Sequence, residues 1–111
     1  MGSNWTAFLI RYRAILSLNA QDDLRRLFDN CPSVLPFVRS QLMLLEESPT
    51  SLSTRSHFPF REKCQLMSFD KDEGDTRHFI HVLFQFGADE QTLHILDIAH
   101  HPRKLKDLLD P

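Results

Sequence analysis

The stretch "HFIHVLFQFGADEQTLHILDIAHH", residues 78–101, decides the fold. Its two apolar runs, 78–86 and 92–101, alternate with the period of two that is typical of β-strands. The "GADEQ" between them has the length and the residue types of a hairpin loop. The sequence therefore predicts an antiparallel hairpin whose second strand stops at two adjacent histidines, just before Pro102.

The residues before this hairpin predict one strand and two helices. Trp5–Tyr12 alternates in the manner of a strand. Residues 19–31 begin with Asn19 as a capping residue and then carry apolar side chains at helical spacing. Residues 34–46 predict a second helix, with Ser33 as its cap. We expect the two helices to form a helical hairpin.

The middle of the chain predicts a polar connection and one more strand. Residues 46–60 are rich in Ser, Thr and Pro, which favours a surface connection. The strand pattern resumes over Lys63–Phe69, and "DKDEGD", residues 70–75, predicts a solvated turn. The order is therefore strand, helical hairpin and a three-stranded antiparallel meander. This order predicts an α+β fold in which one sheet packs on two helices and keeps one face free.

The composition is that of one globular domain, 1–111, with residues 102–111 as a short C-terminal tail. The chain has 111 residues, of which 41% are hydrophobic and 25% charged, so it can build a single core. No apolar stretch approaches the roughly 20 residues of a membrane span, and "MGSNW" lacks the features of a secretory signal. We therefore expect a cytoplasmic protein with no membrane partner. The net charge of −2 argues against indiscriminate nucleic-acid binding, so any site for a polyanion must be local.

The two cysteines, Cys31 and Cys64, fall in unrelated segments and have no paired spacing. This arrangement predicts reduced thiols rather than a disulfide framework or a metal pair. The sequence contains no zinc motif, and we expect neither a metal nor another cofactor.

The register of the hairpin decides which side chains share the free face. We assume that Phe86 pairs with Thr92. This register places two polar pairs on the free face: His81 opposite Asp97 and Arg77 opposite His101. It places His94 opposite Phe84 on the inner face, so His94 is interpreted as a structural residue.

The order of elements and three sequence patterns resemble the RelE/ParE superfamily of bacterial toxins. The patterns are "LMLLEESP" at 42–49, the last hairpin and the basic run "HPRKLK" at 101–106, and the likeness covers almost the whole chain. The resemblance implies the toxin component of a type II toxin–antitoxin system. Members of the superfamily are mostly ribosome-dependent messenger-RNA endonucleases or inhibitors of DNA gyrase, and an antitoxin wrapped around the sheet holds them inactive. An antitoxin is therefore the expected partner, with RNA or the ribosome as a further one.

Two features depart from the superfamily pattern. Many members carry an arginine near the start of the penultimate strand, where this chain has His81 in "IHVLF". Those toxins are usually basic, whereas this chain is slightly acidic. Fold likeness alone does not choose among the activities of the superfamily.

RNA cleavage without a metal needs a base for the ribose 2′-hydroxyl, an acid for the leaving oxygen and a cation for the developing charge. His81 steadied by Asp97 is the candidate base, because histidine titrates near neutrality. His101 is the candidate acid, and Arg77 or Arg103 is the candidate phosphate clamp. The alternative interpretation is that His81 and Asp97 form an ordinary cross-strand surface contact.

Only one of the two adjacent histidines can serve this site. Strand alternation places His100 and His101 on opposite faces, and His101 shares its face with Asp97. We therefore assign the catalytic or phosphate-contacting role to His101 and expect His100 to cap the core or to meet solvent. His57 and His78 carry no functional pattern.

Four further basic residues, Arg11, Arg13, Arg61 and Lys63, lie on or beside the first two predicted strands. Together they could border the free face as a track for phosphates. The alternative is a solvated basic rim.

Three functions remain open at the level of sequence. The first is a metal-independent messenger-RNA endonuclease that an antitoxin neutralises, favoured because the histidines supply proton-transfer groups that binding alone does not need. The second is a catalytically silent RelE-like module that acts only by binding a partner. The third is a gyrase inhibitor of the ParE type.

Overall fold

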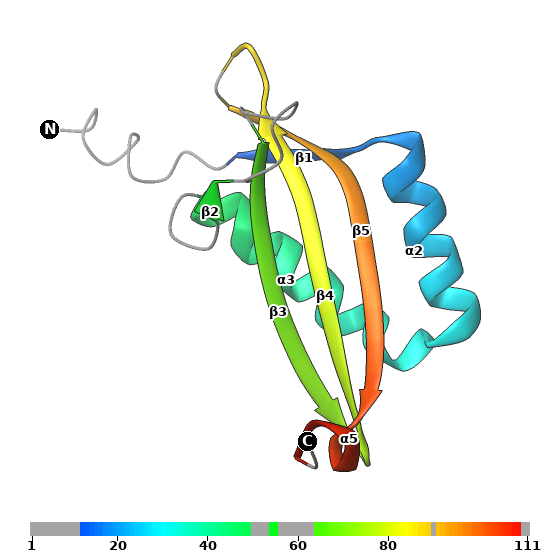
Figure 1. The fold of residues 1–111 in the computed structure, drawn as a ribbon. Coiled ribbons are helices and arrows are strands. Elements are labelled where there is room, and N and C mark those ends of the chain that lie inside the picture. Colours follow the sequence, from blue (N-terminus) through cyan, green and yellow to red (C-terminus); the bar gives the residue numbers. More distant parts are fainter. Residues whose placement is uncertain (1–11, 50–53, 56–63, 90, 110–111) are drawn as a thin grey trace, which may run out of the picture.

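The computed structural model describes residues 12–49, 54–55, 64–89 and 91–109 (Figure 1). The elements in chain order are β1 (Arg13–Leu16), α2 (Leu18–Asn30), the 3₁₀ turn η1 (Pro32–Val34), α3 (Leu35–Glu47), β2 (Thr54–Arg55), β3 (Cys64–Glu73), β4 (Thr76–Phe86), β5 (Thr92–Lys104) and α5 (Leu105–Leu109). The predicted α+β class is confirmed. None of the described helices has the length and hydropathy needed to span a membrane.

The sheet has the strand order β1-β5-β4-β3-β2. The strands β3, β4 and β5 form the predicted antiparallel meander, and β1 pairs in parallel with the start of β5. Figure 1 shows α3 crossing behind the meander and α2 running along the β5 side. The opposite face of the meander carries no described helix.

The first described strand follows the predicted one along the chain. The structure has β1 at Arg13–Leu16, whereas Trp5–Arg11 lie outside the described residues. The end of α3 holds β1 in place, because the Tyr12 N–H donates to the Glu46 carbonyl and the Ala14 N–H donates to the Glu46 carboxylate, both at 2.9 Å. This tertiary contact and the parallel pairing with β5 both involve residues far away in the sequence, so no local pattern reveals them.

The predicted caps of both helices are wrong. Ser17, not Asn19, caps α2: its backbone is extended and its hydroxyl oxygen accepts from the Ala20 N–H at 3.0 Å. For α3 the cap is Val34, because the 3₁₀ turn η1 runs directly into the helix and leaves Ser33 inside a helical turn. The hydroxyl of Ser33 instead donates to the Glu73 carboxylate at 2.8 Å.

We predict that Ser17→Ala lowers the free energy of unfolding by about 1–2 kcal/mol, since it removes a helix cap and a second hydrogen bond. The second bond runs from the Ser17 hydroxyl to the Leu96 carbonyl at 2.8 Å. Urea denaturation followed by circular dichroism measures the loss. The matched control is Asn19→Ala, whose side chain is exposed and should change stability by less than about 0.5 kcal/mol. Equal losses in the two variants would contradict the assignment of the cap.

The core lies between α2, α3 and the inner face of the sheet. Its buried members are Ala20, Leu27, Val34, Val38, Leu45, Met67, Ile80, Val82, Phe84, Leu93, Ile95 and Ile98. On β4 these are the even-numbered residues, as the alternation in the sequence predicts. The free face of β4 is therefore the predicted one.

The predicted turn at residues 70–75 is much shorter than expected. Strand β3 continues to Glu73, and the turn consists of Gly74 and Asp75 alone, because Glu73 already pairs with Thr76. Gly74 has φ +61°, a conformation that glycine adopts without the steric cost of a Cβ atom. The charged side chains at 70–73 therefore lie on a strand and not in a turn.

The predicted register of the last hairpin is wrong, and two separate features of the structure change it. Phe86 pairs with Leu93 instead of Thr92, because the Asp89 carboxylate accepts from the N–H groups of Gln91 and Thr92, both at 3.0 Å, and holds Thr92 at the end of the loop. A β-bulge then interrupts the ladder at Leu96, which has no partner on β4. The two features displace the second half of β5 by two residues.

The side chains of β5 that face inward also differ from the prediction. Before the bulge, the pairing of Phe86 with Leu93 places Leu93 and Ile95 in the core, so His94 does not pack beside Phe84 as predicted and lies opposite Gln85. After it, Ile98 and His100 point inward. Among the described strands, none pairs with this part of β5 on its outer side, and the Asp23 carboxylate of α2 accepts from the Ile98 N–H at 2.9 Å.

The last strand does not stop at Pro102. Strand β5 runs through Pro102, which lies opposite His78, and ends at Lys104, so the helix of the tail begins at Leu105. Proline is tolerated here because β5 is an edge strand at this end and needs no donor on its outer side. The prediction that the strand stops before Pro102 is therefore wrong.

Candidate functional site

The free face of the meander is a grid of three strands and four rows. From one end to the other the rows are Leu66, Leu83 and Asp97; Ser68, His81 and Ala99; Asp70, Phe79 and His101; and Asp72, Arg77 and Arg103. Polar and ionisable side chains thus occupy eight of these twelve positions.

Two imidazoles meet in the middle of this grid. His81 lies opposite Ala99, and His101 lies opposite Phe79 in the next row, so the two histidines are diagonal neighbours. Their ring centroids are 5.9 Å apart, with an angle of 52° between the ring planes. The small side chain of Ala99 leaves space beside His81. The predicted register had set these two histidines two rows apart. The loop and the bulge together displace β5 by two residues and so bring the histidines into adjacent rows.

The predicted pairing of His81 with Asp97 is wrong. Asp97 lies opposite Leu83, one row away, because the register of β5 is displaced. Ser68 of β3 takes the neighbouring position instead, with its hydroxyl oxygen 2.7 Å from the His81 Nδ1 atom. This contact engages Nδ1 and leaves Nε2 as the nitrogen that can exchange a proton with a ligand on the free face.

The predicted pairing of Arg77 with His101 is also wrong, since Arg77 lies opposite Arg103. The Arg77 guanidinium donates to both carboxylate oxygens of Asp72, at 2.6 and 3.1 Å, and lies 3.6 Å from the Asp70 carboxylate. The hydrogen bond to Asp72 raises the pKa of Arg77, and the same bond lowers the pKa of Asp72. Sequence reasoning missed these acids because it assigned residues 70–75 to a turn.

Among the remaining predicted basic residues, Arg13 lies in the described part of the chain, and it does not join this grid. Arg13 is exposed but pairs with Thr92, at the far end of β5. Arg103 lies eleven positions beyond Thr92, which corresponds to roughly 36 Å along a strand. Arg11, Arg61 and Lys63 lie outside the described residues.

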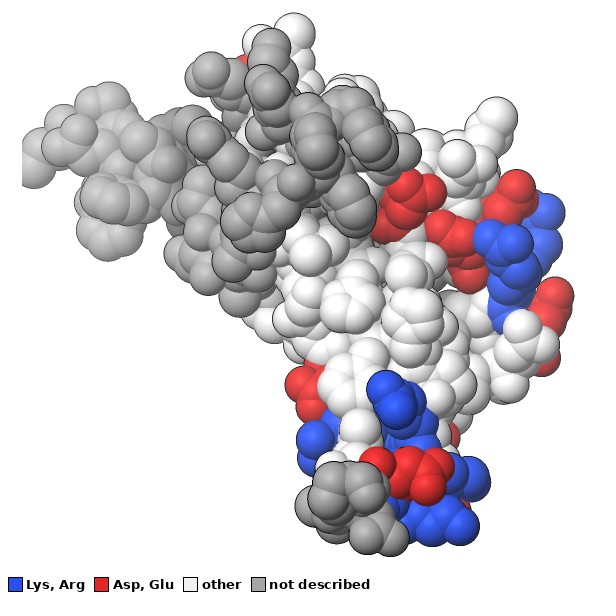
Figure 2. All heavy atoms as spheres, viewed as in Figure 1, with Lys and Arg blue, Asp and Glu red and all other residues white. Residues whose placement is uncertain are grey.

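Charged side chains gather at the end of the free face where β3, β4 and β5 meet α5. Figure 2 shows basic and acidic groups intermixed there, an uncharged centre, and a second mixed group over α2. Arg103 belongs to the first group and is exposed. Lys104, also exposed, pairs with Asp75 at 3.1 Å, and this contact lowers the pKa of Asp75.

A pocket of about 460 Å³ opens between α2 and the edge of β5. Asp23, Arg26 and Asn30 line it from the helix, and Asp97, His100 and His101 line it from the strand. The pocket therefore borders the grid at His101. A ligand lying across the free face could extend into it toward Arg26.

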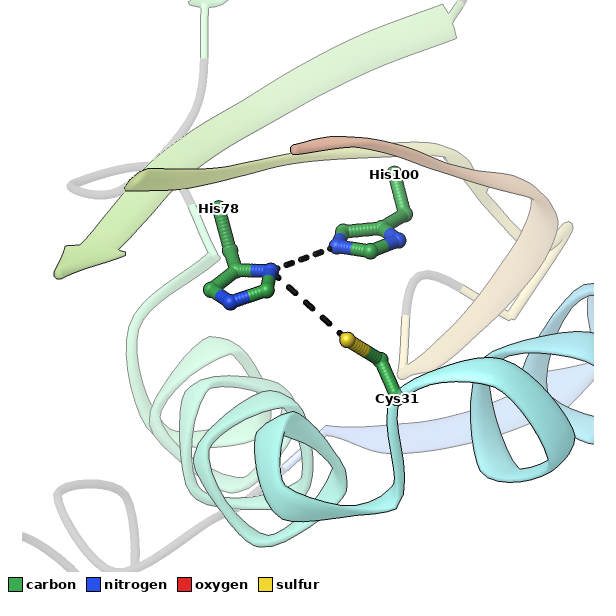
Figure 3. Close-up of side chains that lie close together, drawn as sticks. All are labelled: Cys31, His78 and His100. Carbon is green, nitrogen blue, oxygen red and sulfur yellow. Dashed lines mark hydrogen bonds between the residues drawn. The ribbon is translucent and has the colours of Figure 1, made fainter. Parts of the chain in front are cut away.

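A second group of ionisable side chains lies on the other face of the same strands (Figure 3). His78, which sequence reasoning left without a role, is only 3% exposed and has its Nδ1 atom 2.9 Å from the His100 Nε2 atom. Burial is the main factor that lowers the pKa of His100, with smaller effects from His78 and His101, so His100 favours the neutral form at pH 7. Cys31 Sγ lies 4.0 Å from His78 Nδ1, which makes these three residues a possible metal-ligand set. The alternation of β4, with His78 in phase with Ile80, was the feature that could have revealed this burial.

Comparison with known proteins relates the chain to solved structures by fold. No protein-family model matches the sequence, and no curated protein matches it either. The toxin–antitoxin complex RelBE2 from Mycobacterium tuberculosis contains a similar chain with a TM-score of 0.56 and 19% identity; the match covers 83% of this chain and 100% of that one.

Two E. coli structures are similar to the same extent. A RelE toxin mutant in the free state has a TM-score of 0.57 at 14% identity, covering 80% of this chain and 82% of that one. The intact RelBE toxin–antitoxin complex has a TM-score of 0.55 at 15% identity, covering 83% of this chain and 99% of that one. At these identities the likeness establishes the fold. The chain has the α+β fold of RelE toxins.

Proposed function

We propose that this chain is the toxin component of a type II toxin–antitoxin system and that it cleaves messenger RNA without a metal ion. The observation that supports this function is the pair of histidines, His81 and His101, whose rings lie 5.9 Å apart on the free face of a RelE-like sheet. Two imidazoles at this separation can serve the attacking and the leaving oxygen of one phosphodiester. Pure binding would not need two such groups.

In this mechanism His81 is the general base. With Nδ1 engaged by Ser68, its Nε2 atom takes the proton of the ribose 2′-hydroxyl. The 2′-oxygen then attacks the phosphorus, and the bond from phosphorus to the 5′-oxygen of the next nucleotide breaks. His101, as the general acid, gives its proton to that leaving oxygen. The products are a 2′,3′-cyclic phosphate and a free 5′-hydroxyl.

Cationic groups at the end of the grid stabilise the charge that develops on the phosphate. Arg103 is exposed and two residues from His101 along β5, on the same face. Arg77, opposite it, is already bound to Asp72, so it contributes less to phosphate binding than Arg103. Ser68, and not Asp97 as the sequence suggested, orients His81 in this mechanism. Asp97 lies at the border between the grid and the pocket.

We further propose an antitoxin as the partner, since two of the similar structures are toxin–antitoxin complexes. Several large apolar side chains are exposed on the helices, namely Leu18, Phe28, Met43 and Leu44. They offer apolar area that a bound peptide would cover. Such a partner would inactivate the chain without any change in its covalent structure.

A second candidate function is a catalytically silent RelE-like module that only binds a partner. The ion pairs of Arg77 with Asp72 and Asp70 favour it, because they neutralise a cation that a nuclease would direct at the phosphate. The slightly acidic net charge of −2 points the same way. Gyrase inhibition of the ParE type is the third possibility and needs no residue of the grid to act on a proton.

Inducible expression of the chain in bacteria tests these functions. We predict growth arrest together with new transcript ends that carry 5′-hydroxyl groups, because the proposed mechanism leaves that group on the downstream product. The matched control is His94→Ala, a histidine outside the grid, which should remain toxic. Growth arrest without cleaved transcripts, but with damaged or relaxed DNA, would favour gyrase inhibition, and normal growth with folded protein would favour the silent module.

A further inference from the structure

Three metal-ligating side chains converge on the inner face of the sheet, below the corner where α2 ends. The ligand atoms of Cys31, His78 and His100 all lie within 4.8 Å of one another. His78 Nδ1 is 2.9 Å from His100 Nε2 and 4.0 Å from Cys31 Sγ (Figure 3). We propose that these three residues bind one Zn²⁺ ion and thereby tie the α2–α3 corner to the β4–β5 hairpin.

The separations are close to those that zinc requires. Tetrahedral zinc, with Zn–N near 2.0–2.1 Å and Zn–S near 2.3 Å, places two nitrogen ligands about 3.3 Å apart and a nitrogen and a sulfur about 3.6 Å apart. The separations of His78 from His100 and from Cys31, 2.9 and 4.0 Å, differ from these by about 0.4 Å each, and Cys31 and His100 lie within 4.8 Å of one another, so rotation of the side chains can complete the geometry. The backbone therefore already holds the ligands in place.

The fold brings the ligands together independently of any ion. Cys31 is the residue at which α2 ends, and its N–H donates to the Leu27 carbonyl at 2.7 Å. His78 on β4 and His100 on β5 are diagonal neighbours, since Ile80 is the direct partner of His100 and Pro102 that of His78. The two rings are stacked, with centroids 5.1 Å apart and planes 14° apart.

A carboxylate supports one of the proposed ligands from behind. Glu73 Oε1 lies 4.0 Å from His78 Nε2, the ring nitrogen that points away from Cys31 and His100. When Nδ1 binds a metal, Nε2 carries the hydrogen and donates it toward that carboxylate, an arrangement that is usual behind histidine ligands of zinc. The Ser33 hydroxyl donates to the same Glu73 oxygen at 2.8 Å and so orients the carboxylate.

The types of ligand atom indicate which metal the site would bind. Two imidazoles and one thiolate suit zinc, whereas magnesium and calcium prefer oxygen ligands. Three protein ligands leave a fourth position for water or another small ligand. A pocket of about 550 Å³ that includes Cys31 and His78 in its lining gives solvent and ions a path to the site.

The zinc site is separate from the proposed catalytic grid. His78 and His100 face the helices, whereas His81 and His101 lie on the opposite face of the same strands. The proposed ion therefore acts on stability and does not take part in the proposed cleavage. Metal binding and RNA cleavage can be measured independently, so failure of one proposal leaves the other intact.

Cobalt substitution in the full, tag-free chain tests the coordination directly. We predict one Co²⁺ per chain, with a thiolate-to-cobalt charge-transfer band and the strong visible bands of four-coordinate cobalt. The band disappears in Cys31→Ser and persists in Cys64→Ser, which alters the other cysteine. His100→Gln, as a second ligand variant, loses four-coordinate binding and keeps the test decisive should Cys31→Ser fail to fold by circular dichroism.

Thermal unfolding with and without zinc gives the second measurement. Zinc at about a hundred times its dissociation constant should raise Tm of the native chain by about 10 °C and that of Cys64→Ser equally. Cys31→Ser should show less than about a quarter of this rise. No cobalt band in the native chain, a band that survives Cys31→Ser, or equal zinc effects in Cys31→Ser and Cys64→Ser would each overturn the proposal.

Discussion

Replacement of His101 by alanine lowers the rate of RNA cleavage about 100-fold or more, the usual scale for the loss of a positioned acid or base. The effect is large because the imidazole of His101 is exposed on the free face and its ring lies 5.9 Å from that of His81, the proposed base. Single-turnover cleavage of a labelled transcript, with ribosomes present and absent, measures the rate. Circular dichroism and urea denaturation show whether the variant is folded.

The control for this experiment is the adjacent residue. His100→Ala, which alters a side chain on the helix-facing side, should change the cleavage rate little once folding is verified. A loss of equal size in both variants, or a small effect in both, would contradict the catalytic assignment of His101. In that case the two histidines at 100 and 101 would have a structural role only.

Replacement of Phe84 by alanine lowers the free energy of unfolding by about 3–5 kcal/mol, since it leaves a cavity at the centre of the core. Phe84 is 0% exposed, and its ring contacts that of Phe86 with centroids 6.0 Å apart. A loss of this size is a large part of the stability of a domain of this length. Urea denaturation at equilibrium measures it as a shift of the midpoint.

The control for the core is an aromatic residue at the surface. Phe28 on α2 is 58% exposed, so Phe28→Ala should change the free energy of unfolding by less than about 0.5 kcal/mol. A loss at Phe84 no larger than the loss at Phe28 would show that β4 does not pass through the core. Such a result would contradict the whole arrangement of the meander on its helices.

Local patterns in the sequence were sufficient for the class of fold and for the faces of β4. The periods of two and of 3.6 residues separated strands from helices, and their order predicted an α+β sheet on a helical hairpin. The alternation within residues 78–86 placed His81 and Arg77 on the free face correctly, because successive side chains of a strand point to opposite faces whatever the strand pairs with.

The register of β5 against β4 could not be predicted from such local patterns. It depends on a loop in which Asp89 holds Thr92, and on a bulge at Leu96 whose carbonyl accepts from the Ser17 hydroxyl, 79 residues earlier in the chain. Neither feature has a local sequence pattern. As a result the sequence paired His81 with Asp97, whereas the tertiary structure sets His81 beside Ser68 and His101.

The sequence by itself thus determined the class of fold, the order of the main elements and, on β4, the face on which each residue lies. The tertiary structure alone decided which residues are neighbours across strands, and it brought Cys31 to His78, 47 residues away. The physical reason is the range of the interactions. Periodicity follows from the geometry of a few consecutive residues, whereas register and side-chain clusters follow from loop conformation and packing over the entire chain.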